Sequence, residues 1–142
     1  MRNAATENAR YRPCPCPCRG AADALLFPAC CGRYHAGPLH LLAPTAEALM
    51  RSRYSAFVLD AFGYLLATWH TSTRPESLMP NPAGSSRLGL EVRRHTVIGA
   101  DHATVEFVAR HKLGGRAERL HEVSRFLRED GRWFYVDADN AG

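Results

Sequence analysis

The residues whose type and spacing best suit a chemical role are the five cysteines, which all lie within residues 14–31 of a 142-residue chain. Cys14, Cys16 and Cys18 alternate with prolines, whereas Cys30 and Cys31 are adjacent. Disulfides between cysteines this close in sequence would be strained, but a tetrahedral metal ion accepts two short-spaced pairs joined by a loop. The spacing therefore predicts a small metal knuckle with structural Zn²⁺, and a redox disulfide or an iron–sulfur cluster is the alternative.

Two ligand registers fit this pattern. The ligands that we predict are Cys16, Cys18, Cys30 and Cys31. In the other register Cys14 pairs with Cys16, and His35 is an alternative to Cys31 as the fourth ligand. A closed four-ligand site has no open position for a substrate, so the metal indicates stability or docking rather than catalysis.

The composition is typical of a soluble globular protein, with 46% hydrophobic and 23% charged residues. No apolar run approaches the roughly 20 residues that span a bilayer, so we expect no membrane segment. The polar N-terminus lacks the apolar core of a secretory signal, which predicts a cytoplasmic protein with reduced thiols. The net charge of +4 is modest, and it favours a mixed, solvated surface over a dedicated nucleic-acid face.

Two helices are predicted after a linker that is rich in turn-forming residues. Thr45 is a suitable N-cap, and apolar residues recur at helical spacing through residues 46–58. Arg53 falls outside this apolar stripe. Asp60 is placed to cap a second short helix, which we expect at residues 61–70.

Beyond the proline-containing loop 71–86 the apolar residues alternate, which is typical of strands. The expected strands are 88–92, 104–109, 120–127 and 133–136. Asp130-Gly131 is a hairpin signal between the last two, so the strands form an antiparallel meander. Strand 104–109 has apolar residues on both faces, which permits a homodimer through the outer face of the sheet.

These elements predict an α+β fold in which helices pack on the concave face of a curved antiparallel sheet, giving a cone-shaped domain. The domain boundaries that we expect are a polar tail at 1–13, the metal knuckle at 14–37 and the α+β domain at 38–142.

The cysteine pattern resembles the SEC-C zinc motif found at the end of the SecA translocation ATPase. Cys-Pro-Cys, a spacer and Cys-Cys-Gly carry this resemblance. The chain departs from the motif in two ways: eleven residues separate Cys18 from Cys30, which is a longer spacer, and Arg19-Gly20-Ala21 stands where Gly-Ser-Gly is usual.

Several later blocks follow in order and resemble the YchJ-like family of uncharacterised bacterial proteins. They include APTAEALMRSRYSAF at 43–57, VEFVAR at 105–110 and HEVSRFLREDGRWFYVD at 121–137. The resemblance implies a nuclear transport factor 2-like (NTF2-like) domain and a zinc site, but no assigned reaction. The second, C-terminal SEC-C motif of some members is absent from this sequence.

A fold of this kind implies a pocket between the helices and the sheet. The polar and aromatic residues of the matched blocks that could line it are Tyr54, Trp69, His70, Glu122, Arg125 and Trp133. His121 and Glu122 are adjacent in a strand and face opposite sides, so only one of them can enter the pocket. No residue is assigned a catalytic role.

Three functions are compatible with this sequence. We expect a zinc-binding protein of unassigned activity, acting as a non-enzymatic adaptor whose knuckle docks on a protein or ribonucleoprotein partner. The first alternative is a small enzyme that uses His70 or His121 as an acid or base in the pocket. The second is a nucleic-acid binder whose affinity falls steeply with salt.

Overall fold

The computed structural model describes residues 14–16, 26–80 and 85–141, and in it helices precede strands. The helical elements are η1 (Phe27–Ala29), α2 (Gly32–His35), α3 (Ala46–Val58) and α4 (Phe62–Ala67). The strands are β1 (Ser85–Ile98), β2 (His102–Leu113), β3 (Arg116–Glu129) and β4 (Arg132–Asn140). None of the helices in the described ranges has the length and apolar character needed to span a bilayer.

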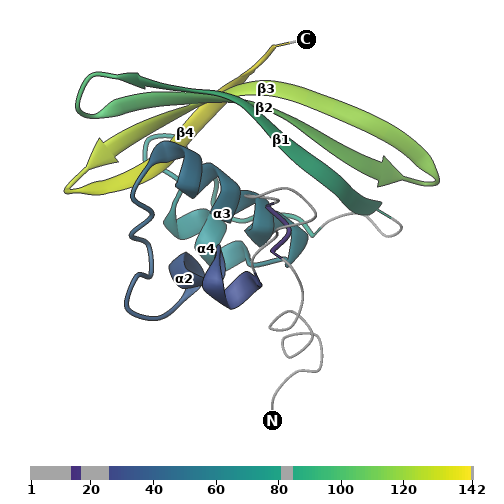
Figure 1. The fold of residues 1–142 in the computed structure, drawn as a ribbon, viewed down its shortest axis with the longest axis horizontal. Helices are drawn as coiled ribbons and strands as arrows, with labels where there is room; N and C mark the ends of the chain where they lie inside the picture. The colour runs from purple at the N-terminus through teal and green to yellow at the C-terminus, as the bar shows by residue number, and fades with distance from the viewer. Residues whose placement is uncertain (1–13, 17–25, 81–84, 142) are drawn as a thin grey trace.

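The four strands form one antiparallel sheet in the order β1-β2-β3-β4, as the meander prediction requires. Asp130 and Gly131 have φ angles of 52° and 76°, the left-handed pair that a two-residue hairpin turn needs. The register is irregular near Gly89 in β1 and at Arg125 in β3. Such bulges bend strands, and the sheet arches over the helices (Figure 1).

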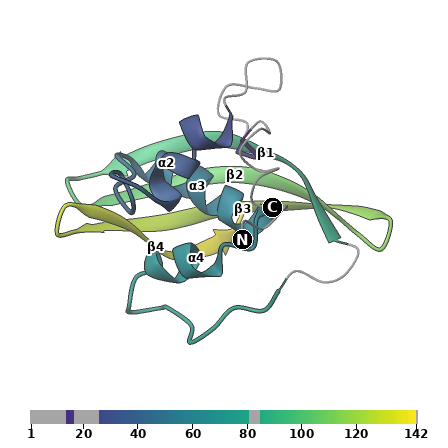
Figure 2. The same cartoon turned by 90° about the horizontal axis from the view of Figure 1, so that it is seen from below.

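Helix α3 occupies the predicted range and lies across the concave face of the sheet (Figure 2). The Thr45 hydroxyl accepts a hydrogen bond from the Ala48 amide at 3.0 Å, which confirms the predicted N-cap. Helix α4 is shorter than predicted. It ends at Ala67 because the next residues pair with β4: the Tyr135 amide donates to the Thr68 carbonyl oxygen, and the His70 amide donates to the Tyr135 carbonyl oxygen.

The predicted cap of α4 was wrong. The N-cap residue is Ala61, and no side chain caps the helix there. Asp60 instead has a φ angle of 54°, so it belongs to the turn between the two helices. A short acidic residue tolerates this left-handed conformation better than most residues do.

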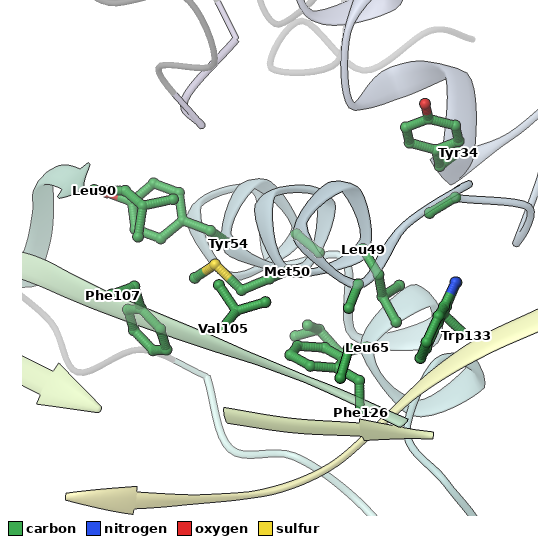
Figure 3. Packing of buried hydrophobic residues seen from close by; sticks show 14 of the residues in the cluster. Tyr34, Leu49, Met50, Tyr54, Leu65, Leu90, Val105, Phe107, Phe126 and Trp133 are labelled. Atoms are coloured by element: carbon green, nitrogen blue, oxygen red, sulfur yellow. The ribbon is translucent and has the colours of Figure 1, made fainter. Parts of the chain in front are cut away.

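The main core lies between α3, α4 and the inner face of the sheet (Figure 3). Its most enclosed large side chains are Leu49 from α3, Leu65 from α4, Val105 from β2 and Phe126 from β3. Burying each contributes about 1.5–3 kcal/mol. Val108 of β2 lies outside this core but is 0% exposed, because the chain itself covers it. Its burial therefore needs no second subunit, and the homodimer stays a prediction.

Candidate metal centre and inner pocket

Four cysteines form a compact buried cluster next to the helices. The Sγ atoms of Cys14, Cys16, Cys30 and Cys31 all lie within 4.8 Å of one another. The side chains are 0–5% exposed, and no disulfide joins them. Because each residue offers one sulfur ligand, the cluster could hold a metal ion.

The two helical turns around Cys30 and Cys31 fix that pair. The Phe27 carbonyl oxygen accepts a hydrogen bond from the Cys30 amide at 3.0 Å, and α2 begins immediately after Cys31. A Cβ atom added to Gly32 would lie 2.7 Å from the same Phe27 oxygen. The glycine in Cys-Cys-Gly therefore lets α2 pack closely against η1, which keeps the two thiols together.

Helix α3 contacts the cluster through two side chains. The Ser55 hydroxyl lies 3.4 Å from the Cys14 sulfur, and Arg51 donates from Nη1 to the Cys16 carbonyl oxygen at 2.7 Å. The two buried serines of α3, Ser52 and Ser55, were not identified from the sequence. Their position among the apolar residues of the helix could have identified them, because a small polar side chain there lets another segment approach the helix closely.

His35 is not a member of the cysteine cluster among the described residues, and it contacts α3 and α4 instead. Its Nε2 atom lies 2.8 Å from the Ser52 carbonyl oxygen and must carry the proton, since a carbonyl only accepts. The ring stacks on Tyr64 with centroids 4.2 Å apart. Burial lowers the pKa of His35, which favours the neutral ring. His35 therefore clamps α2 onto α3.

The predicted ligand set is only partly covered by the structure. Cys16, Cys30 and Cys31 lie in the cluster, but Cys18 lies outside the described residues. Cys14, which the chosen register left spare, is the fourth member of the cluster among the described residues. This grouping is compatible with the second register, in which Cys14 pairs with Cys16, and the choice between the registers stays a prediction.

The ionisation of these thiols is strongly interdependent. Hydrogen bonds with Cys16 and Cys31 lower the pKa of Cys14, whereas hydrogen bonding with Cys14, Cys16 and Cys30, together with burial, raises the pKa of Cys31. A thiolate at one position thus opposes ionisation at its neighbour. Four thiolates in this space need a cation, which is the condition under which cysteine binds metal.

A separate cavity of about 210 Å³ lies between α3 and the inner face of the sheet. Tyr54, Trp69 and Glu122, three of the six residues named from the sequence, line it. Phe107 and Tyr135 add aromatic walls from β2 and β4. Burial raises the pKa of Glu122, because the ionised carboxylate loses solvent there.

The other three predicted pocket residues lie elsewhere. His70 lies beyond the end of α4, and its ring contacts the Ser72 hydroxyl at 2.7 Å and Glu129 at 3.0 Å. Arg125 is exposed and pairs with Asp137 and Asp139 of β4, while Trp133 belongs to the core.

The histidines proposed as acid or base also lie apart from the pocket walls. His121 contacts Glu106 at 2.7 Å, and the adjacent Glu122 lines the pocket, as strand alternation predicts. Neither His70 nor His121 contributes to the described pocket lining. The pocket therefore does not support the histidine-based enzyme alternative.

Arg53 is a buried charged residue of the pocket that was not predicted from the sequence. It is 4% exposed, although it was expected outside the apolar stripe. Its Nη1 atom donates to the Leu65 carbonyl oxygen at 2.8 Å and to the Thr68 hydroxyl at 2.7 Å, and its guanidinium stacks on Trp69 and Tyr135. The available signal was its position four residues from both Leu49 and Phe57 on the helix.

Comparison with known proteins places this architecture in a family. A family model described as "YchJ, middle NTF2-like domain" matches residues 45–138. A UPF0225 protein of Methylibium petroleiphilum is 59% identical over 132 residues, covering 93% of both chains. A UPF0225 protein of Bordetella parapertussis is 58% identical over 127 residues, covering 89% of this chain and 93% of the relative.

Two solved structures share the fold. The solution structure of a SEC-C motif containing protein from Rhodopseudomonas palustris has a TM-score of 0.72 and 30% identity, covering 84% of this chain and 95% of that one. The crystal structure of a SEC-C motif containing protein from Psychrobacter arcticus has a TM-score of 0.74 and 29% identity, covering 95% and 86%. These likenesses confirm the expected fold and the SEC-C-like character of the cysteine cluster, and the chain belongs to the UPF0225 family, with a YchJ-type middle NTF2-like domain.

Proposed function

We propose that this chain is a zinc-binding protein in which the ion is structural, and that it acts as a binding or adaptor module rather than an enzyme. The observation that carries the proposal is the closed set of four buried sulfurs within 4.8 Å of one another. Zinc–sulfur distances of about 2.3 Å in a tetrahedron put the sulfurs about 3.8 Å apart. The 3.5 Å between the sulfurs of Cys16 and Cys30 is close to this value.

The competing uses of the cysteines fit less well. A disulfide requires sulfurs about 2.05 Å apart and would leave a second pair to be explained. A four-iron cluster places eight atoms between its cysteines, so it needs wider spacing than this cluster has. A single iron ion would fit the same tetrahedron, and metal analysis distinguishes it from zinc.

Zinc would supply a cross-link rather than a Lewis acid, because four cysteines fill a tetrahedral coordination shell. Cys14 and Cys16 come from one segment, and Cys30 and Cys31 from another. Through Ser55 and Arg51 the cluster is also attached to α3. The ion would therefore hold the N-terminal knuckle on the NTF2-like domain.

The segments that flank the cluster support the adaptor part of the proposal. Leu26, Leu39 and Leu42 are 48%, 44% and 47% exposed. Exposed leucines in the segments before and after the second cysteine pair are candidate contacts for a protein partner.

The zinc part is tested by metal analysis of the full chain purified under reducing conditions. We expect one zinc per chain, and removal of the ion by a strong chelator should lower the unfolding temperature. Because metal binding is coupled to folding, the shift should reverse when zinc is restored. A chain that is equally stable with and without metal would contradict a structural role.

The adaptor part is tested by affinity capture with a double variant, Leu39→Ser and Leu42→Ser. Met79→Ser is the matched control, because Met79 is 88% exposed and lies outside the flanking segments. We expect the wild type and the control to enrich the same protein, and the double variant to lose it. Equal enrichment by all three would exclude this surface as the docking site.

A further inference from the structure

The cavity between α3 and the sheet is lined mainly by aromatic and aliphatic side chains. Tyr54, Phe57 and Met50 contribute from α3, and Phe107 and Phe126 from the sheet. Several of these side chains converge between the helix and β2 (Figure 3). Such walls suit the apolar body of a small molecule.

The same cavity holds a buried cation that lacks a counter-ion. The Arg53 guanidinium forms no ion pair with any carboxylate in the described residues, although it is 4% exposed. Buried charges are normally paired, because removing them from water is costly. Here two hydrogen bonds from Nη1 and the faces of Trp69 and Tyr135 offset part of that cost.

The remaining donors of Arg53 are available to a ligand. Its Nε and Nη2 atoms make no hydrogen bond within the described part of the chain, and the residue lines the cavity. Burial lowers the pKa of Arg53 to about 10, which still leaves the guanidinium charged at neutral pH. Arg87 and Glu122 also line the cavity.

We propose that this cavity is a binding site for a small carboxylate with a flat apolar body, whose carboxylate pairs with the Arg53 guanidinium. A planar carboxylate matches the two-nitrogen edge of an arginine, which a spherical anion does not. The aromatic walls select the body, and the carboxylate supplies the counter-ion that the protein lacks. The site is independent of the cysteine cluster and of the proposed adaptor function.

The volume limits the size of the ligand. An apolar cavity of about 150 Å³ accommodates benzene, so about 210 Å³ has room for one ring that carries a carboxylate. Benzoate is therefore a suitable probe. Benzamide is the matched neutral control, because it has the same shape without the charge.

The test is a titration of the metal-loaded full chain with each probe, followed by ¹⁵N–¹H NMR that includes the arginine Nε resonances. We expect benzoate to bind at one site with a Kd of about 1 mM and to shift the Arg53 Nε resonance. Benzamide should bind at least about tenfold more weakly, because it forgoes the charge-assisted hydrogen bonds.

Three variants locate the site. Arg53→Met should abolish the preference for benzoate over benzamide. Ala109→Leu puts a larger side chain into the lining and leaves Arg53 in place, so it should weaken both probes, and circular dichroism checks that the variant is folded. Arg110→Gln is the control, because this arginine is exposed and should bind benzoate as the wild type does.

The proposal is overturned by any of three results. The first is no saturable binding of benzoate to the wild type. The second is equal affinity for benzoate and benzamide. The third is unchanged benzoate binding by Ala109→Leu, which remains decisive even if Arg53→Met does not fold.

Discussion

Replacing Gly32 by alanine should destabilise the protein, whereas the same change at Gly63 should not. A Cβ at position 32 would meet the Phe27 carbonyl oxygen at 2.7 Å and its ring at 3.0 Å. Ordinary contact begins near 3.4 Å, so the oxygen must retreat by about 0.7 Å (3.4 − 2.7). That oxygen also accepts the hydrogen bond of the Cys30 amide, so moving it disturbs the cysteine pair.

The magnitude follows from two opposing effects. Overpacking against a fixed backbone atom costs about 1–3 kcal/mol, and alanine is favoured over glycine in a helix by about 0.5–1 kcal/mol. The difference spans about 0–2.5 kcal/mol, and its mid-values give a net loss of about 1 kcal/mol for Gly32→Ala, or about 2–4 °C in the unfolding temperature. Gly63 lies in α4 with no atom within 4 Å of an added Cβ, so Gly63→Ala should gain about 0.5–1 kcal/mol.

The assay is thermal and denaturant unfolding of the metal-loaded proteins, together with competition against a chelator of known affinity. Gly32→Ala should bind metal more weakly than the wild type, because it displaces Cys30 and Cys31. If Gly32→Ala is as stable as Gly63→Ala and binds metal equally well, then the close packing of α2 against η1 does not position the thiols.

Two further predictions concern α3 and its neighbours. Thr45→Ala should lower the free energy of unfolding by about 1 kcal/mol in denaturant unfolding, because the Ala48 amide loses its capping acceptor; an unchanged midpoint would show that water caps the helix equally well. Burial raises the pKa of Tyr64 to about 12, against about 10 in the unfolded chain, so the unfolded state loses its proton first and stability falls by up to about 2–3 kcal/mol as pH rises from about 10 to 12. Unfolding measured across this range should show a shallower decline for Tyr64→Phe, and parallel curves would refute the assignment.

The sequence predicted the elements that depend on local patterns. Helix α3 has its predicted bounds, because Thr45 supplies a cap and the apolar spacing continues to Val58. The strands were predicted in the right places but too short. Their ends at Ile98 and Leu113 are exposed, so the sequence there shows no alternation of apolar and polar residues. The Asp130-Gly131 turn was identified because its backbone angles demand those residues.

Features that depend on tertiary partners were not predictable in the same way. The burial of Arg53 is decided by Trp69 and Tyr135, which lie in other elements. Helix α4 ends early because β4 offers backbone partners to Thr68 and His70. The register of the first cysteine pair was open, because overlapping Cys-Pro-Cys steps present the same local chemistry twice.

Native mass spectrometry of the full chain, purified under reducing conditions, tests the central claim most directly. The chain should carry one zinc ion, which Cys14→Ser and Cys30→Ser should lose and Cys18→Ser should retain, because the buried cluster contains Cys14, Cys16, Cys30 and Cys31. A chain with no metal, a chain with iron, or a mass that indicates an internal disulfide would contradict the zinc assignment. Loss of zinc from Cys18→Ser but not from Cys14→Ser would show that the other register forms the site.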